Sequence, residues 1–511
     1  MLSSLFFRKG LIIFLLIGVS LFLQSGLTSA ANGSNGNDEG VEVLMRGPIH
    51  EAFAEVSVDE TQQEAVTSRS VPDPINEIPP DFRPEGDQIE WIPGYWSWDE
   101  DQDDFIWVSG VWRDVPPGRQ WIPGYWMSVE GGNQYISGFW TDTNQKETIY
   151  LPPPPKPLEA GPSSPAMTPN HGWVDGNWVW HHDRYAWRAG YWVEQSPDMV
   201  WVPAHYVWSP RGYIFIMGYW DYQLPHRGVM FAPLYYKQPT YRNHGYYYTP
   251  SIVLNIDAIF LSLFIRRGSH HYYFGDYHDH RYEKRGFYPW YSKHATRYGY
   301  DPYYRSYRSY QLRHDGNWEK NYHQQFQYRR DHKEARPQQN YRLQPEHNFD
   351  QSRGLKNHMI GRRLTDVVKQ KDQPVQFKRL KPDQKKEFQS QDQKLKKLQV
   401  ERRKVERAPV KEGKSWKPTD IKKPVRLKMP VSPIKANPER RPVFERSKGK
   451  PQENQRVKPQ DQTENRPQAE QPERQRLKRQ EQPQKQHQDK PQRKKQLNPQ
   501  DQIKEQPPAN E

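Results

Sequence analysis

Eight copies of one aromatic motif constrain the fold of this chain more than any other feature. Each copy spans six residues, and the copies begin at residues 91, 107, 121, 135, 173, 187, 201 and 215; seven of the eight have the pattern aromatic–x–x–Gly–x–aromatic. Sixteen of the nineteen tryptophans lie between Trp91 and Trp220. Self-similarity at a fixed period marks the structural unit of a repeat fold. The motif copies are therefore the expected folding units, in a first array at 91–140 and a second at 173–224.

Two backbone geometries fit the motif. In the first, the central dipeptide is a two-residue hairpin loop, which Asp175-Gly176 suits. Pro93 and Pro123 oppose it, because a type I′ turn needs positive φ where proline holds φ near about −65°. In the second geometry each copy is one strand, its glycine is a kink or bulge, and the polar intervals between copies are the turns. We favour the second, which predicts a mainly β fold with two antiparallel four-stranded meanders.

The first thirty residues have the features of an export signal. Arg8 and Lys9 precede an apolar stretch from 10 to 23, and Thr28-Ser29-Ala30 resembles a cleavage site. An uncleaved membrane anchor is the alternative, but the stretch is shorter than the roughly 20 residues that span a bilayer. The chain has no cysteine, which excludes disulfides and a lipid-bearing N-terminal cysteine. We expect a protein exported to the periplasm, the cell envelope or the medium.

Charge is divided sharply along the chain. Residues 31–224 carry 10 Lys and Arg against 29 Asp and Glu (net −19), 225–350 carry 19 against 11 (+8), and 351–511 carry 44 against 21 (+23). Such asymmetry suggests an electrostatic partner for the basic tail. Export argues against nucleic acid and favours lipid phosphates or acidic envelope polymers. A solvated tail without a fixed partner is the alternative.

These features divide the chain into seven segments. The signal occupies 1–30, an acidic extended leader 31–90, the first array 91–140, a proline-rich spacer 141–172, the second array 173–224, a Tyr/His/Arg-rich region 225–350 and the basic tail 351–511. The leader allows a short helix over 49–56. The apolar run 251–265 is expected to pair with or pack on the second array, and order is expected to loosen from about residue 300.

Low apolar content predicts a disordered tail with one exception. Phe388, Leu395, Leu398 and Val405 recur at heptad-like spacing, which predicts a helix or weak coiled coil over 382–407, interrupted by Arg402.

Aromatic side chains supply the first set of candidate binding residues. The first tryptophan of each motif is expected in the hydrophobic layer of the sheets. Trp98, Trp180 and Trp208 stand outside the six-residue motifs and are the candidate exposed platforms for sugars or peptides.

Histidines supply a weaker metal-binding candidate, comprising His270, His271, His278 and His280. His278 and His280 would share a face of a strand. Two other patterns are incomplete. His50-Glu51 begins a zinc-protease helix motif whose second histidine is replaced by Ala54, and Asp99-x-Asp101-x-Asp103 begins a calcium loop without its glycine and its glutamate. We therefore expect no cofactor and no catalytic residue.

The motif array resembles that of the YXWGXW (WXXGXW) repeat proteins, which are exported bacterial proteins. The resemblance covers 91–220, and it is carried by the repeated glycines and aromatic residues such as Trp91, Gly94 and Trp96. Ala204 and Tyr206 depart from the pattern in the copy at 201–206. The resemblance implies export and a non-enzymatic role, and it implies no catalytic residues.

Together these patterns favour a non-enzymatic envelope protein. Its β head would dock proteins or glycans, and its basic tail would tether it to anionic polymers or lipids. The alternatives are a metal-binding protein or enzyme centred on His270–His280 and a structural matrix component.

Overall fold

The computed structural model describes residues 40–56, 65–158, 161–162, 164–168, 170–292, 301–343, 359–370, 375–407 and 423–437. The chain divides into two units, Met1–Phe444 and Glu445–Glu511, and all described residues belong to the first. The expected export signal and the chain after residue 437 lie outside the described residues.

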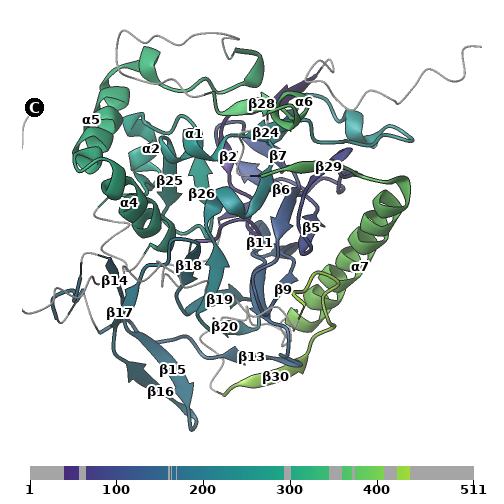
Figure 1. Cartoon of the computed structure of the whole chain (residues 1–511). Coiled ribbons are helices and arrows are strands. Elements are labelled where there is room, and N and C mark those ends of the chain that lie inside the picture. Colours follow the sequence, from purple (N-terminus) through teal and green to yellow (C-terminus); the bar gives the residue numbers. More distant parts are fainter. Residues whose placement is uncertain are drawn as a thin grey trace, which may run out of the picture. The chain divides into compact units, whose positions relative to one another are not determined.

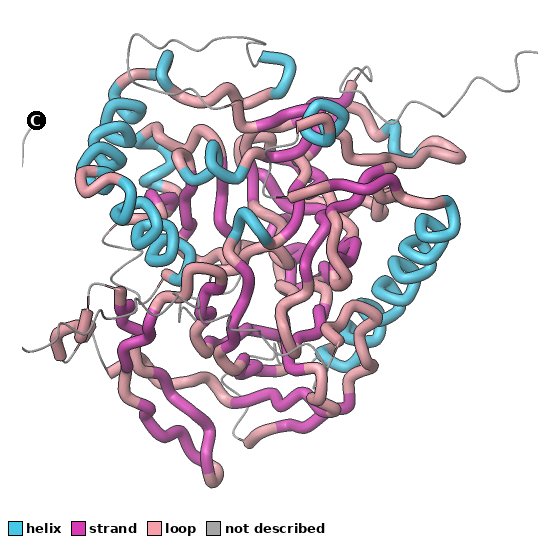
Figure 2. The backbone as a smooth tube through the Cα atoms, in the orientation of Figure 1, coloured by secondary structure: helices cyan, strands magenta, loops and turns pink. Residues whose placement is uncertain are grey.

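The eight motif copies form four long antiparallel hairpins, each built from two consecutive copies (Figures 1 and 2). In hairpin 1, β5 (Ile89–Ile92) continues into β6 (Tyr95–Asp99), and these pair with β8 (Val111–Asp114) and β7 (Asp104–Val108). Hairpin 2 contains β9 (Arg119–Ile122), β10 (Tyr125–Val129), β11 (Gly132–Ile136) and β12 (Phe139–Asp142). Hairpin 3 contains β14 (His171–Val174), β15 (Asn177–His181), β16 (Arg184–Arg188) and β17 (Tyr191–Glu194). Hairpin 4 contains β18 (Met199–Val202), β19 (His205–Ser209), β20 (Gly212–Ile216) and β21 (Tyr219–Tyr222).

Aromatic pairs across the two strands of a hairpin explain the motif's spacing. Trp91 lies opposite Trp112, and Trp96 opposite Trp107, with ring centroids 5.1 and 5.2 Å apart in edge-to-face contacts. Such pairs add about 0.5–1.5 kcal/mol beyond the area they bury. The first geometry, in which Trp91 would pair with Trp96, is therefore wrong.

Each strand is interrupted at the central dipeptide of its motif. A side chain at Gly94 would collide with the carbonyl oxygen of Val108 and lie 2.7 Å from Nε1 of Trp107. Glycine is required here because the tryptophan of the opposite strand packs directly on its backbone. The kink expected within each strand is confirmed.

The mainly β, antiparallel class is confirmed, but the pairing within the arrays differs from two four-stranded meanders. Among the described residues, no ladder joins β8 to β9 or β17 to β18. Pro116-Pro117 offers no N–H donor between hairpins 1 and 2, and strands distant in sequence fill the hairpin edges instead. These are β3 (Val66–Thr67) on β11, β13 (Glu147–Leu151) on β20, β22 (Gly228–Met230) on β8 and β23 (Leu234–Tyr236) on β7.

The expected extended leader is part of the fold. Its strands are β1 (Val41–Val43) on β23, β2 (Gly47–Pro48) on β26 (Tyr272–Phe274), β3, and β4 (Phe82–Pro84) on β29 (Phe377–Arg379). The short helix expected over 49–56 is instead a turn, in which the N–H of Phe53 donates to the carbonyl of His50 at 2.8 Å. Ala52 and Phe53 are 0% exposed, so this turn lies at the centre of the core.

The Tyr/His/Arg-rich region is more regular than expected. Beyond β22, β23 and β26 it contains η1 (Leu224–His226), η2 (Thr240–Arg242), β24 (Ile252–Leu254), α1 (Ile256–Phe260), β25 (Leu263–Arg266), α2 (His280–Lys284), β27 (Phe287–Pro289), α4 (Pro302–His314), α5 (Trp318–Asp331), η3 (Lys333–Ala335) and η4 (Tyr341–Leu343). The loose order expected after about residue 300 is wrong for α4 and α5, whose tyrosines pack on a buried aromatic cluster.

The apolar run 251–265 does not pair with the second array. It forms β24, α1 and β25, and its two strands pair with β28 (Gly361–Arg363), β26 and β27. The sheets formed by these pairings contain no strand of the motif hairpins.

Described parts of the basic tail are also ordered, contrary to the expected disorder. They contain β28, α6 (Leu364–Val368), β29, α7 (Pro382–Glu406) and β30 (Val425–Lys428). The helix expected over 382–407 is confirmed as α7. It packs on the hairpins, with Phe388 against Trp112 and with Leu395 and Leu398 buried.

Arg402, which interrupts the apolar stripe of α7, is fully buried. It pairs with Glu406 at 3.0 Å and donates to the carbonyls of Pro123 and Ser137, both at 2.9 Å. The hydroxyl of Tyr125 donates to Glu406 at 2.8 Å. A buried charge needs such partners, so this ion pair holds α7 in one position on hairpin 2.

Among the helices of the described residues, none combines the length and the apolar character needed to cross a membrane.

We predict that Gly138→Ala destabilises the protein. The added methyl would lie 2.5 Å from Cζ2 of Trp121 and 2.7 Å from Oε1 of Glu51, both buried. Overpacking of this kind lowers the free energy of unfolding by about 1–3 kcal/mol, measured by urea denaturation. Gly316→Ala is the control, since its added methyl would meet no atom within 4 Å beyond its own chain neighbours. Equal losses in the two variants would contradict the close packing of the kink.

Candidate functional site

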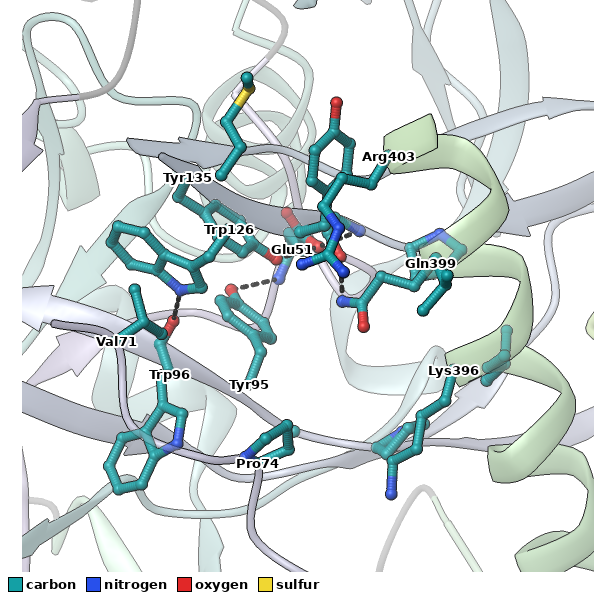
Figure 3. A pocket seen from close by; sticks show the side chains of 18 of the residues that line it. Glu51, Val71, Pro74, Tyr95, Trp96, Trp126, Tyr135, Lys396, Gln399 and Arg403 are labelled. Carbon is teal, nitrogen blue, oxygen red and sulfur yellow. Dashed lines mark hydrogen bonds between the residues drawn. The ribbon is translucent and has the colours of Figure 1, made fainter. Parts of the chain in front are cut away.

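A cavity of about 1030 Å³ opens between hairpins 1 and 2, the proline-rich segment 70–77 and α7 (Figure 3). Ligand pockets commonly measure about 300–1,000 Å³, so this one is large. The two copies of the motif with identical sequence, Trp-Ile-Pro-Gly-Tyr-Trp at 91–96 and 121–126, both contribute to its lining. Tyr95 and Trp126 are only partly buried and present ring surface to the cavity.

A buried carboxylate holds the kink of hairpin 1. Glu77 accepts from the N–H of Gly94 at 2.6 Å, from the N–H of Gly110 at 2.9 Å and from the indole of Trp107 at 3.3 Å. The two glycines belong to the two motif copies of the hairpin. One side chain thus satisfies donors on both strands at the point where the ladder is interrupted.

Glu51 does the same for hairpin 2. It accepts from the N–H of Gly138 at 2.8 Å, the N–H of Gly124 at 3.3 Å and the hydroxyl of Tyr135 at 2.8 Å. Tyr135 opens the fourth motif copy as Trp107 opens the second, so the arrangement repeats. We call each such glutamate with its two glycines a carboxylate clip.

Burial shifts the protonation of these groups. It raises the pKa of Glu77 to about 7, against the opposing effect of its three N–H donors. It also raises the pKa of Glu51, again opposed by the hydrogen bonds and by nearby His271. Burial lowers the pKa of His50 to about 3, so this imidazole is neutral at pH 7. Its Nε2 lies 3.1 Å from the carbonyl oxygen of Pro93.

A polar network connects Glu51 with Tyr95, which lines the cavity. The hydroxyl of Tyr95 lies 3.0 Å from Nε2 of His271 and accepts from the backbone N–H of Glu51 at 3.3 Å. The rings of Tyr95 and Tyr135 stack, with centroids 5.2 Å apart and planes 11° from parallel. This network orients Tyr95 relative to the two hairpins.

Helix α7 supplies the charged wall. Lys396, Gln399 and Arg403 line the cavity (Figure 3), and the amide of Gln399 donates to the carbonyl of Gly124. Lys396 pairs with Asp392 at 2.7 Å. Among the ion pairs of the described residues, none includes the exposed guanidinium of Arg403.

This arrangement is suited to binding. Both glutamates are engaged by backbone donors, which favours a structural role for them. The groups left to meet a ligand are the aromatic faces, the exposed polar side chains and the α7 cations.

The three aromatic platform candidates do not form one site. Trp98 is partly buried against Phe105, and Trp180 is partly buried against Tyr185 in hairpin 3. Trp208 is only 8% exposed, so its assignment as an exposed platform is wrong: β19 turns this face toward a buried aromatic cluster. None of the three lines the cavity described above.

The four histidines do not form a common ligand set. His271 contacts Tyr95, and His278 is buried 3.3 Å from Asp276. His280 is exposed at the start of α2, beside Glu283. The shared strand face expected for His278 and His280 is wrong, because the chain turns into α2 between them. His270 is partly exposed, and its carbonyl accepts from Val56. No group of three or more metal-ligating side chains occurs within the described ranges.

The acidic turn of hairpin 1 is used for ion pairs. Asp99 pairs with Arg46 and Asp103 with Arg69, each at 2.8 Å, and Asp101 accepts from the hydroxyl of Tyr282 at 2.6 Å. These contacts engage the carboxylates of the incomplete calcium-loop pattern.

The glutamates that shape the cavity were not predicted from the sequence. Glu51 belongs to an incomplete zinc-protease motif, and Glu77 belongs to no motif. The sequence offers one indication for Glu77, which is its place between Ile75 and Ile78. A carboxyl group among apolar residues is buried only when other groups pair with it.

Comparisons of the chain with family models, curated proteins and solved structures found no match. The likeness to the YXWGXW repeat proteins therefore rests on the motifs alone.

We predict a pH-dependent contribution of Glu77 to stability. Its pKa rises from an ordinary 4.5 to about 7 on folding, so its protonated form favours the folded state and this contribution is lost as pH rises from 4.5 through 7. Wild type should lose about 3 kcal/mol more than Glu77→Gln over this range, measured by urea denaturation. Glu85→Gln, at an exposed carboxyl, is the control and should parallel wild type. Parallel curves for wild type and Glu77→Gln would contradict the prediction.

Proposed function

We propose that this protein is a non-enzymatic binding protein of the bacterial cell envelope whose cavity holds a segment of an envelope glycan. The observation that carries the proposal is the cavity itself, in which two identical aromatic motifs and α7 surround one open volume. The features of an export signal in the first thirty residues support the location.

Ring surfaces in the cavity favour sugars as ligands. The polarised C–H bonds of a sugar ring pack on the electron-rich face of an aromatic ring, and Tyr95 and Trp126 offer such faces. Gln399, Arg403 and Asn133 lie around them and can hydrogen-bond to hydroxyl groups. Apolar surface with a few convergent polar groups is typical of ligand sites.

The same walls are less suited to a peptide. An extended peptide commonly adds as a strand to a sheet edge and uses a row of backbone donors and acceptors. At this cavity the motif strands are kinked, and the N–H groups of Gly94 and Gly124 donate to the buried glutamates. Of the glycan and protein ligands expected for the β head, the geometry therefore favours the glycan.

Tethering by the basic tail to anionic polymers or lipids stays a separate prediction. Residues 351–444 carry 28 Lys and Arg against 10 Asp and Glu (net +18), whereas 445–511 carry 16 against 11 (net +5). Most of the positive charge thus falls in the unit that contains the hairpins. Deleting 351–511 would remove α7 with it, so a test of tethering should delete 445–511.

We predict that Trp126→Leu weakens glycan binding about tenfold, corresponding to about 1.4 kcal/mol for an aromatic contact in the site. The measurement is affinity of the full-length protein for immobilised oligosaccharides released from bacterial envelopes, with circular dichroism to verify folding. Trp180→Leu is the matched control, since Trp180 is also partly buried but lies in hairpin 3, outside the cavity lining. Loss with Trp180→Leu alone would move the site to hairpin 3, and absence of binding by wild type would reject the proposal.

A further inference from the structure

We infer that the glycan held in this cavity is acidic and that its anionic group lies against Arg403. The inference rests on the proposed glycan-binding function and adds the chemical class of the ligand. The shared chemistry is a sugar bearing a carboxylate or a phosphate.

Arg403 has the properties that this role needs. It is exposed, it lines the cavity, and none of the ion pairs within the described residues involves it. Gln399 lies one turn before it and Arg407 one turn after it on the same wall of the cavity. A guanidinium presents a planar fork of donors that matches a carboxylate or phosphate with two parallel hydrogen bonds.

The acids nearby do not cancel this charge. Glu51 and Glu77 are only 3% and 4% exposed, and backbone N–H groups already donate to both. Asp392 pairs with Lys396 on the preceding part of α7. The exposed part of the wall is therefore left with a positive charge, although the hairpin segment of the chain is strongly acidic overall.

The backbone that carries Arg403 is anchored by the neighbouring residue. Arg402 is fully buried and donates to carbonyls of hairpin 2, which anchors the turn of α7 that carries Arg403. The backbone of this turn is thus held beside the cavity before a ligand arrives. Preorganisation of this kind reduces the entropy lost on binding.

The test uses the full-length protein and a galacturonate tetramer, with its fully methyl-esterified form as the neutral control. Both oligomers have the same rings, and only the first is charged. A hexose tetramer carrying phosphate monoesters forms a third arm that distinguishes phosphate from carboxylate recognition. Affinity is measured by calorimetry at low and at high salt.

We expect the acidic tetramer to bind about tenfold to a hundredfold more tightly than the methyl ester, and Arg403→Gln to remove most of that difference. Lys397→Gln is the matched control, because it removes the same charge from an exposed position of α7 outside the cavity lining. It should leave the preference intact. Higher salt should weaken binding of the acidic tetramer more than binding of the ester.

The outcomes separate this inference from the proposed function. If the acidic tetramer and its ester bind equally and Trp126→Leu weakens both, the cavity binds glycans but the acidic preference is wrong. If Arg403→Gln and Lys397→Gln have equal effects, the charge acts at long range and Arg403 is not the contact. If none of the three oligomers binds, both the inference and the glycan proposal are rejected.

Discussion

Two buried carboxylates hold hairpins 1 and 2 together at the points where their strands are interrupted. In hairpins 1 and 2 the ladder is interrupted at the motif glycines, so a glycine N–H on each strand needs a partner outside the ladder. An unpaired buried donor costs about 1–3 kcal/mol. Glu77 and Glu51 each satisfy two such donors, and both come from the segment before the first motif. Hairpins 1 and 2 therefore depend on a part of the chain that contains no repeat.

The carboxylate clips also set the shape of the cavity. They hold Pro93–Trp96 and Pro123–Trp126 in the cavity lining, and the turn that carries Glu51 is buried in the core. Helix α7 lines one side of the cavity, and the buried ion pair of Arg402 and Glu406 helps to hold the helix there. The aromatic residues and the cations that line the cavity thus come from segments far apart in the sequence. Aromatic rings and cations, which the sequence places in a head and a tail, line one cavity.

Local patterns predicted part of this fold. The motif spacing, the prolines and the polar intervals predicted strands, kinks and turns, because each depends on φ, ψ and side-chain alternation within a few residues. The spacing of Phe388, Leu395 and Leu398 predicted α7 for the same reason. Partners of those elements were not predicted. β22 lies on β8, and β13 lies between β20 and β30, at separations that no local pattern encodes.

The candidate site shows the same division. Trp208 was expected on the surface and is buried, while Arg402 was expected to interrupt a helix face and instead anchors it. The sequence by itself determined the repeat unit, the spacing of the motif tryptophans along the chain, the absence of disulfides and the uneven distribution of charge. Only the tertiary structure decided that Glu77 and Glu51 satisfy the glycines of hairpins 1 and 2 and that α7 lies beside them. The reason is physical: burial and hydrogen-bond satisfaction depend on which distant segments pack together, and that is a property of the whole fold.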